Sequence, residues 1–349
     1  AAYTRIFSIF LIGLFVLGTG LALLQTAVNP FITIIGPSES AAVRISFMGI
    51  CNKFAGFISP LVLSALVMHG MEKFSDDKLN ALSGGDKDML LSELASRLVG
   101  PYVVMAIVLF IFGVIVKFSG LPDKIDVEDD HDGTLDDFIK QIPQALRIPH
   151  VLLGVITLFL YVGVEVMAGD SLTQFGKDIQ LSNAATLTSY TMAFMILGYI
   201  LGIIFIPKYI SQSGALQASA ILGIICSIGA GIASVTDTSL FSMIFGWLNG
   251  FPGFNFEIIP NSVFFVTLLG LANALMWPAI WPLVLKDLGS YTKIASALLI
   301  MSIAGGAIIP PIYASLGQKI GFQPALLIMV PMYIFILYYA VKGHKVRNS

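Results

Sequence analysis

The sequence predicts an all-α, polytopic membrane protein, and two observations carry this prediction. The first is composition: of 349 residues, 56% are hydrophobic and 11% are charged, whereas soluble domains carry about 25% charged residues. The second is distribution, because the apolar residues form long blocks and the mean hydropathy of the chain is +0.88. Blocks of about 20 apolar residues are long enough to cross a bilayer as helices. The lipid bilayer is therefore the first partner that we expect.

We expect nine spans in this chain. They run from about 7 to 28, 45 to 68, 99 to 118, 151 to 173, 186 to 206, 216 to 235, 263 to 285, 294 to 316 and 324 to 341. Pro30 follows the first span and is expected to end it, because proline removes a helical hydrogen bond. The piece from 240 to 248 is too short to cross, so we expect it at the interface or padding a loop.

Composition also excludes several classes of function. The formal net charge is −2 and no basic run is present, so nucleic acid is not an expected partner. Cys51 and Cys226 both lie in apolar spans, which argues against a disulfide framework. No His, Cys, Asp or Glu grouping has metal-ligand spacing, and no glycine-rich phosphate loop occurs. We expect no metal site and no resident cofactor, and we do not expect an enzyme.

The loops predict an orientation. Lys and Arg are more frequent on the side that holds the acidic connector from 120 to 150 and the C-terminus, which places both in the cytoplasm. Within the connector, Leu135, Phe138 and Ile142 repeat at helical spacing, and Thr134 is placed to cap. We expect a short amphipathic helix there, tethering two halves of the protein.

The end of the first span carries polar side chains in an apolar setting. Gln25, Thr26 and Asn29 lie within five residues and precede Pro30. In lipid, such side chains face either a neighbouring helix or a water-filled cavity. Two interpretations stay open at this point: hydrogen bonding between helices, or the wall of a solute-binding cavity.

An internal repeat suggests how the spans are organised. Pro30, Arg44, Gly56 and Pro60 around the second span recur as Pro278, Lys293, Gly306 and Pro310 around the eighth. If the repeat is real, spans one to three match spans seven to nine, and three further spans are missing before the first. Two parallel six-span halves joined by a cytoplasmic connector describe the major facilitator architecture. The expected parts are residues 1–119, the connector 120–150, and residues 151–349.

Several segments then resemble one family. They are Gly20 to Phe31, Arg44 to Asn52, Tyr161 to Glu165, Trp277 to Gly289, and Gly305 to Pro310. In order, they look like the fourth, fifth, seventh, tenth and eleventh helices of the fucose permease family. The members of that family are sugar–cation symporters of the major facilitator superfamily. The similarity covers essentially the whole chain and begins at the family's fourth helix. It implies a major facilitator fold without its first three helices, in an N-terminally truncated chain.

The resemblance also implies a function. It points to a secondary transporter that imports a hexose or amino-hexose with a cation, and the residues after Asn52 look closest to the glucose, galactose and N-acetylglucosamine branch. The family's fourth helix usually carries a glutamate where this chain has Gln25. A carboxamide releases no proton, so the sequence favours sodium over the proton as coupling ion. Asn52 matches an asparagine that the resemblance implies contacts sugar.

Three charged residues are candidates for ion coupling. Glu165 and Asp170 are the acids within or near a span, and a carboxylate in the bilayer centre costs several kcal/mol unless it is paired or hydrated. The two are five residues apart, which on an α-helix points them about 140° apart. Lys53 lies inside its span; it either snorkels to the surface or pairs with Glu165.

Sugar binding needs hydrogen-bonding groups for the hydroxyls and an aromatic face for the apolar side of the ring. The candidates for the first role are Gln25, Asn29, Asn52 and Asn273, and for the second Tyr161 and Trp277. Each aromatic residue has an alternative role as an interface anchor.

Other functions remain as alternatives. A major facilitator antiporter for drugs or organic anions would require cations lining the cavity, and Lys53 is the feature that favours it. An intramembrane enzyme is a further alternative, but the sequence places no paired acids, metal ligands or Ser/His arrangement at one membrane depth. The sequence therefore favours a monomeric transporter of the bacterial cytoplasmic membrane.

Overall fold

The structure is a computed structural model that describes residues 6–67, 84–120, 135–181, 187–251 and 258–346. These residues form helices joined by turns, and no strand occurs among them. Nine of the described segments are long and apolar enough to cross a membrane. The expected fold class and number of spans are therefore confirmed.

The chain divides into two compact units. The first comprises residues 1–25 and 55–126, and the second comprises residues 26–54 and 127–349. The first unit contains the beginning of α1, the end of α2, and α4 (Gly84–Phe118). Its apolar side chains are largely exposed, for example Phe15 at 76% and Phe110 at 73%. An apolar surface of this kind needs lipid or another apolar surface against it.

The expectation that Pro30 ends the first span is wrong. Helix α1 runs from Phe7 to Ile34 with Pro30 inside it. A proline inside a helix leaves one carbonyl without its usual donor, and neighbouring groups can satisfy that carbonyl. Helix α2 then runs from Ala41 to Val67, and α4 begins ahead of the third predicted span, at Gly84.

The helices of the second unit follow the predicted spans closely, with breaks inside four of them. Their bounds are α6 Pro149–Val166, α7 Leu172–Asp178, α8 Leu187–Phe205, α9 Gln212–Ile232, α10 Ser239–Phe245, α11 Asn261–Ala274, α12 Met276–Leu285, α13 Thr292–Met301, α14 Gly305–Ile320, α15 Phe322–Ala325 and α16 Met329–Val341. A π-helical turn, Met167–Ser171, joins α6 to α7, and a 3-10 turn, Ser302–Ala304, joins α13 to α14.

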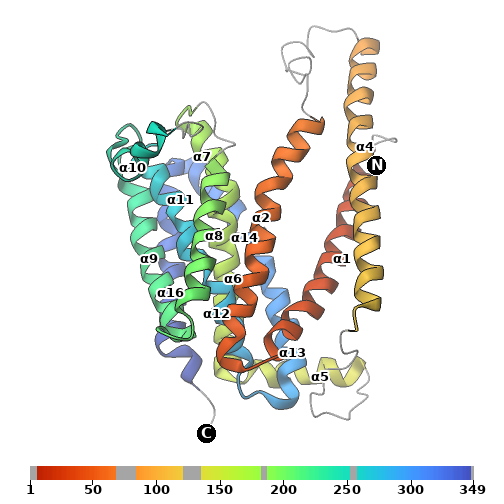
Figure 1. The fold of residues 1–349 in the computed structure, drawn as a ribbon, viewed down its shortest axis with the longest axis vertical. Helices are drawn as coiled ribbons and strands as arrows, with labels where there is room; N and C mark the ends of the chain where they lie inside the picture. Colours follow the sequence, from red (N-terminus) through yellow and green to blue (C-terminus); the bar gives the residue numbers. More distant parts are fainter. Residues whose placement is uncertain (1–5, 68–83, 121–134, 182–186, 252–257, 347–349) are drawn as a thin grey trace. The chain divides into compact units, whose positions relative to one another are not determined.

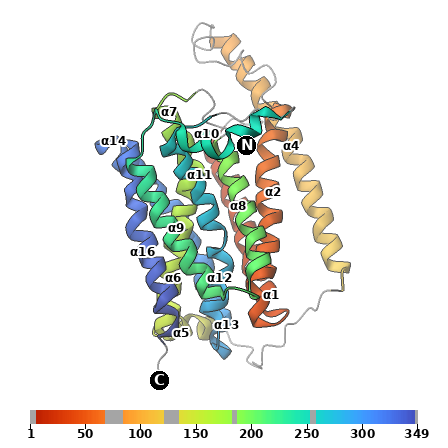
Figure 2. The same cartoon turned by 60° about the vertical axis from the view of Figure 1, so that its left-hand side comes forward.

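The core of the second unit is a set of closely packed helices (Figures 1 and 2). Helix α11 packs against α8 and α9, α9 packs against α16, and α6 packs against α14, α16 and α12. Gly305 shows why small residues occupy these contacts: a Cβ there would lie within 2 Å of the Phe159 carbonyl oxygen, at 1.9 Å. In a bilayer the hydrophobic effect does not drive helices together, because lipid is as apolar as their side chains. Helices there associate through close packing, which small residues such as glycine allow.

The amphipathic connector helix is present. Helix α5 runs from Leu135 to Leu146, and its Ala145 is fully buried against Ile294 and Leu298 of α13. The Tyr291 hydroxyl donates a hydrogen bond to Gln144 Oε1 at 3.1 Å. The proposed cap at Thr134 lies outside the described residues.

The short piece at 240–248 forms α10 and a 3-10 turn, Gly246–Gly250. Phe241 is buried, and its ring packs edge-on against that of Phe264 at 5.7 Å between centroids. Before α10, the Asp237 carboxylate accepts hydrogen bonds from the Ser239 amide and from Asn261 Nδ2. These bonds hold the helix against the start of α11, as expected for a segment that pads a loop.

Candidate functional site

The centre of the candidate site is an ion pair between two helices of the second unit. The Lys53 Nζ on α2 donates to Glu165 Oε1 on α6 at 2.5 Å, and the two side chains are 16% and 18% exposed. A charged side chain within the bilayer is costly when alone, and partnership with the opposite charge removes much of that cost. Of the two open interpretations of Lys53, the structure places it against Glu165.

Glycine allows α2 to come close enough for this pair to form. Gly49 lies one turn before Lys53, on the same face of α2. A Cβ on Gly49 would lie 2.6 Å from two ring carbons of Tyr199 on α8, which is closer than real Cβ contacts. One turn before Gly49 on α2, the Ser46 Oγ lies 3.5 Å from the position that a Cβ on Gly202 of α8 would take. The α2 face of Ser46, Gly49 and Lys53 is therefore fitted to α8 and α6.

Two tyrosines accompany the pair. Tyr161 lies one turn before Glu165 on α6 and is 1% exposed, and Tyr199 is 4% exposed. Both hydroxyls interact electrostatically with the Glu165 carboxylate. Tyr199 was not among the predicted sugar-binding or ion-coupling residues, because an aromatic residue in an apolar span has no pattern that indicates such a role.

An aromatic group extends from Tyr161. Its ring lies 6.3 Å from that of Trp277 on α12, with 51° between the planes, and Trp277 lies 5.6 Å from Trp281. Tyr161 and Trp281 are buried, whereas Trp277 is half-buried. Trp277 is thus the one of these three rings that is partly accessible, and it contacts both of the others.

The backbone changes form directly after Glu165. Met167–Ser171 is a π-helical turn, a feature that occurs mostly as single-turn bulges and often at functional sites. The 140° angle expected between Glu165 and Asp170 assumed a regular α-helix and is therefore wrong. The side chain of Asp170 lies outside the described residues, so its coupling role stays a prediction.

The four carboxamides differ in their exposure. Asn52 is exposed beside Lys53, and Asn29 is 3% exposed. Asn273 is 1% exposed, and its Oδ1 accepts a hydrogen bond from the Tyr333 hydroxyl at 2.8 Å, which joins α11 to α16. Gln25 is exposed and belongs to the other unit. Their roles in binding stay predictions, and the buried Asn273 acts here as a contact between helices.

Arg44 has a structural role that the sequence did not reveal. Its guanidinium donates to the carbonyls of Ile32, at 2.9 Å, and Thr33, at 2.8 Å, and to Ser40 Oγ at 2.7 Å. These bonds satisfy carbonyls at the end of α1, which have no partner inside the helix. The side chain of Gln212, at the start of α9, donates in turn to the Ser38 carbonyl of the same turn at 2.9 Å. In the sequence, Arg44 had stood out as a loop cation and as a member of the internal repeat, which did not reveal these bonds.

The described residues contain no group of three His, Cys, Asp or Glu side chains suited to a metal ion. What the arrangement offers chemically is an acid whose charge is balanced by an ammonium on another helix. Neutralising the carboxylate would leave the ammonium without its partner, so the charge state of Glu165 is linked to the contact between α2 and α6.

Known proteins resemble the chain over most of its length. A glucose/galactose transporter of Brucella abortus (biovar 1, strain 9-941) is 28% identical over 350 residues, covering 99% of this chain and 74% of that protein. An L-fucose-proton symporter of Escherichia coli (strain K12) is 23% identical over 328 residues, covering 93% of this chain and 69% of that protein. No protein-family profile matches the chain.

Solved structures agree on the fold. A crystal structure of the major facilitator superfamily transporter FucP in the outward conformation matches with a TM-score of 0.78 at 21% identity, covering 97% of this chain and 77% of that one. The chain therefore has the major facilitator fold, and its resemblance to the fucose permease-like sugar transporters is confirmed. The relatives are named as transporters, so the expectation that the chain is not an enzyme is also confirmed.

Proposed function

We propose that this major facilitator transporter imports a hexose or amino-hexose together with a cation, as a monomer in a bacterial cytoplasmic membrane with its C-terminus inside. The observation that carries the proposal is the Lys53–Glu165 ion pair, together with Tyr161 one turn before Glu165, whose ring lies 6.3 Å from that of the half-buried Trp277. Transporters of this architecture place substrate and coupling-ion sites near the bilayer midplane and alternate access to them. The names of the relatives, glucose/galactose transporter and L-fucose-proton symporter, support the same substrate class.

The ion pair supplies a means of coupling. While Glu165 is ionised, its attraction for Lys53 holds α2 to α6. When Glu165 takes up a cation, the attraction falls and Lys53 is free to leave. A ligand shifts a conformational equilibrium only if it binds one state better than the other. A cation at Glu165 meets this requirement, because it competes with Lys53 and so favours the state in which α2 and α6 are apart.

Of the two cations, we propose the proton. A sodium ion needs several oxygen ligands, whereas a proton needs one acid. The groups near Glu165 include the Lys53 ammonium, which is a competitor for a cation and not a ligand. The sequence argument for sodium rested on Gln25, and it excludes proton transfer only at that position. The relative named as a proton symporter also favours the proton.

The sugar would lie against Trp277. Stacking of the apolar ring face on an aromatic side chain leaves the hydroxyls to carboxamides and tyrosines. Asn52 is the carboxamide best suited to this role, because it is exposed and adjacent in sequence to Lys53. We expect Trp277→Leu to raise the KM for the sugar more than tenfold and Asn52→Ala to raise it less.

The antiporter for drugs or organic anions is the weaker alternative. It would need a cation free to attract an anion, and Lys53, the residue that favoured it, is held by Glu165 at 2.5 Å.

The test separates coupling from binding. In the intact protein in proteoliposomes, Glu165→Gln should abolish accumulation of labelled galactose against a gradient while sparing counterflow, since counterflow needs no net cation movement. Asp178→Asn, on the exposed end of α7, is the matched control and should leave both unchanged. Accumulation that survives in Glu165→Gln contradicts the coupling assignment, and uptake of non-sugars with no hexose counterflow contradicts the substrate class.

A further inference from the structure

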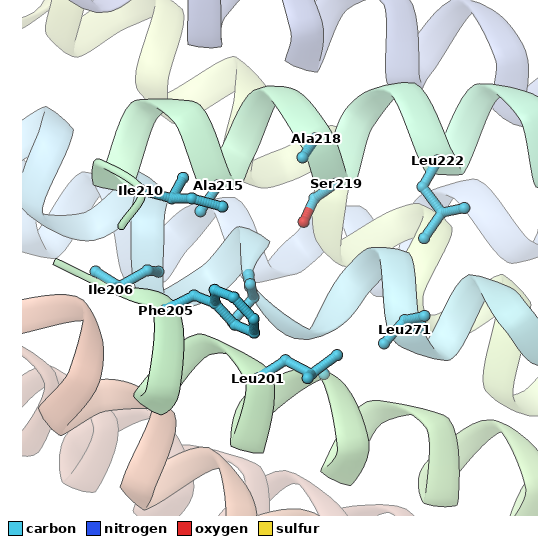
Figure 3. Close-up of a pocket in the computed structure, with 11 residues that line it drawn as sticks. Leu201, Phe205, Ile206, Ile210, Ala215, Ala218, Ser219, Leu222 and Leu271 are labelled. Carbon is cyan, nitrogen blue, oxygen red and sulfur yellow. The ribbon is translucent and has the colours of Figure 1, made fainter. Parts of the chain in front are cut away.

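A cavity of about 280 Å³ lies between three helices of the second unit, away from the ion pair. One wall comes from α8, the other from α9, and the floor from α11 (Figure 3). Its lining residues are Gly198, Leu201, Phe205, Ile206, Ile210, Ala215, Ala218, Ser219, Leu222, Leu271 and Leu275. We call it the α8–α9 groove.

The groove opens sideways to the surface that faces the bilayer. Three of its lining side chains, Leu201, Phe205 and Ile210, are 36%, 41% and 39% exposed. They belong to segments that are long and apolar enough to span the membrane, or to the turn that joins two of them. A lipid is therefore the molecule that meets this opening.

The size and chemistry of the groove suit one acyl chain. Sites for drug-sized ligands measure about 300–1,000 Å³ and include several polar groups. Here ten of the lining residues are apolar or glycine, and Ser219 is the exception. A sugar would lose its hydrogen bonds in such a site, whereas a hydrocarbon chain loses none.

Ser219 adds one polar contact at a defined place. The residue is 6% exposed, and its oxygen points into the groove (Figure 3). Among the described residues, no hydrogen bond to its hydroxyl is present. A hydroxyl without a protein partner can donate to a bound molecule, and an ester carbonyl of a lipid would accept its hydrogen bond.

A positive charge lies at the end of the groove where the chain turns from α8 to α9. Lys208 occupies the turn between Ile206 and Ile210, both lining residues. Its Nζ lies 5.0 Å from the ring centroid of Tyr209, and the Tyr209 ring lies 5.8 Å from that of Phe205, which lines the groove. This turn also leads into the N-terminus of α9, where the helix dipole favours an anion. An exposed lysine and tyrosine at the end of a span are typical of the headgroup region.

We propose that the α8–α9 groove binds an anionic phospholipid, with one acyl chain between α8 and α9, an ester carbonyl at Ser219, and the phosphate at Lys208. The lipid would then lie directly behind Ile206 and Ala215, which pack against Ala42 of α2. The site is separate from the sugar and cation site, and the inference holds whatever the protein transports.

The test uses photoactivatable phosphatidylglycerol and phosphatidylcholine, each with a diazirine in one acyl chain. The intact protein is placed in nanodiscs with either probe, and cross-linked peptides are mapped by mass spectrometry. Wild type should cross-link phosphatidylglycerol at peptides of α8 and α9 about fivefold more than phosphatidylcholine, the preference expected for one lysine near the headgroups. Lys208→Gln should remove the preference, while Lys319→Gln, at the end of α14, should keep it.

Two further variants locate the chain and the ester. Ala218→Trp fills the groove from its exposed side and should abolish labelling there, whereas Ile221→Trp, exposed on the same helix but outside the lining, should not. A dialkyl-ether phosphatidylglycerol probe should label wild type less than the ester probe and Ser219→Ala equally with both. Even labelling of all exposed helices, equal labelling by both headgroups in wild type, or undiminished labelling in Ala218→Trp would overturn the proposal.

Discussion

The Lys53–Glu165 pair predicts a strong energetic coupling between α2 and α6. The change to make is a double-mutant cycle with Lys53→Met and Glu165→Gln, which remove the charges and keep the side-chain lengths similar. Each single change leaves the other group largely buried, since the side chains are only 16% and 18% exposed. Breaking a fully buried pair costs about 3–5 kcal/mol, and with this partial exposure we expect about 2 kcal/mol for each.

The double variant should be less damaged than the singles suggest. It leaves no uncompensated charge, so we expect a loss of about 1 kcal/mol and hence a coupling energy of about 3 kcal/mol. The measurement is the free energy of unfolding by SDS titration in mixed micelles.

An internal control exists on another helix. Arg97 and Glu93 on α4 form an exposed pair at 2.7 Å, with side chains 26% and 51% exposed. A pair of this kind, four residues apart on a helix surface, should show a coupling of about 0.3–0.5 kcal/mol. If the Lys53 and Glu165 changes are additive within about 0.5 kcal/mol, the pair does not hold α2 to α6, and the reasoning about coupling fails with it.

Three other predictions concern the frame around the site. Gly49→Ala should destabilise the protein by about 1–3 kcal/mol in the same titration, because its Cβ would lie 2.6 Å from the Tyr199 ring. Gly56→Ala is the control and should not destabilise it, because nothing lies within 4 Å of a Cβ there. Equal effects of the two changes would contradict the close fit at Gly49. Arg44→Lys should lower the free energy of unfolding by about 2 kcal/mol, since an ammonium cannot bind the carbonyls at the end of α1 as the planar guanidinium does. An unchanged free energy of unfolding would show that these bonds are dispensable. The pKa of the Asp237 carboxyl lies below its ordinary value, chiefly through the hydrogen bond from the Ser239 amide. A carboxyl with a lowered pKa contributes stability above the unfolded value of about 3.9, and this contribution is lost as pH falls through the folded value. The protection of α10 amides, measured relative to their intrinsic exchange rates, should therefore fall below about pH 4, and Asp237→Asn should lose this pH dependence.

Much of the fold follows from the sequence because hydropathy measures directly what the bilayer selects. The nine spans and the helix at Leu135–Leu146 were predictable from apolar length and periodicity. Their ends and interruptions were not. Pro30 lies inside α1, and the π-helical turn after Glu165 leaves no mark in the residue pattern. Such features depend on how neighbouring helices satisfy the backbone, which the sequence of one helix does not contain.

The candidate site divides in the same way. Lys53 and Glu165 stand out because charges are rare within apolar spans, and because opposite charges within the membrane usually form ion pairs. Asn273 carries the same polarity signal, yet the structure buries it against Tyr333, because carboxamides serve both as ligands and as contacts between helices. Gly49 was missed for another reason. A glycine reveals its purpose only when its neighbour is known, and here that neighbour, Tyr199, is distant in sequence.

The most direct test of sugar–cation symport through Glu165 is a pH recording in a weakly buffered suspension of de-energised cells that express the intact protein. On addition of galactose, we predict that the medium becomes alkaline in wild type, with or without sodium, and that the pH stays constant in Glu165→Gln cells that still perform counterflow. Galactose uptake that requires sodium and leaves the pH unchanged, or alkalinisation that persists in Glu165→Gln, would contradict the account.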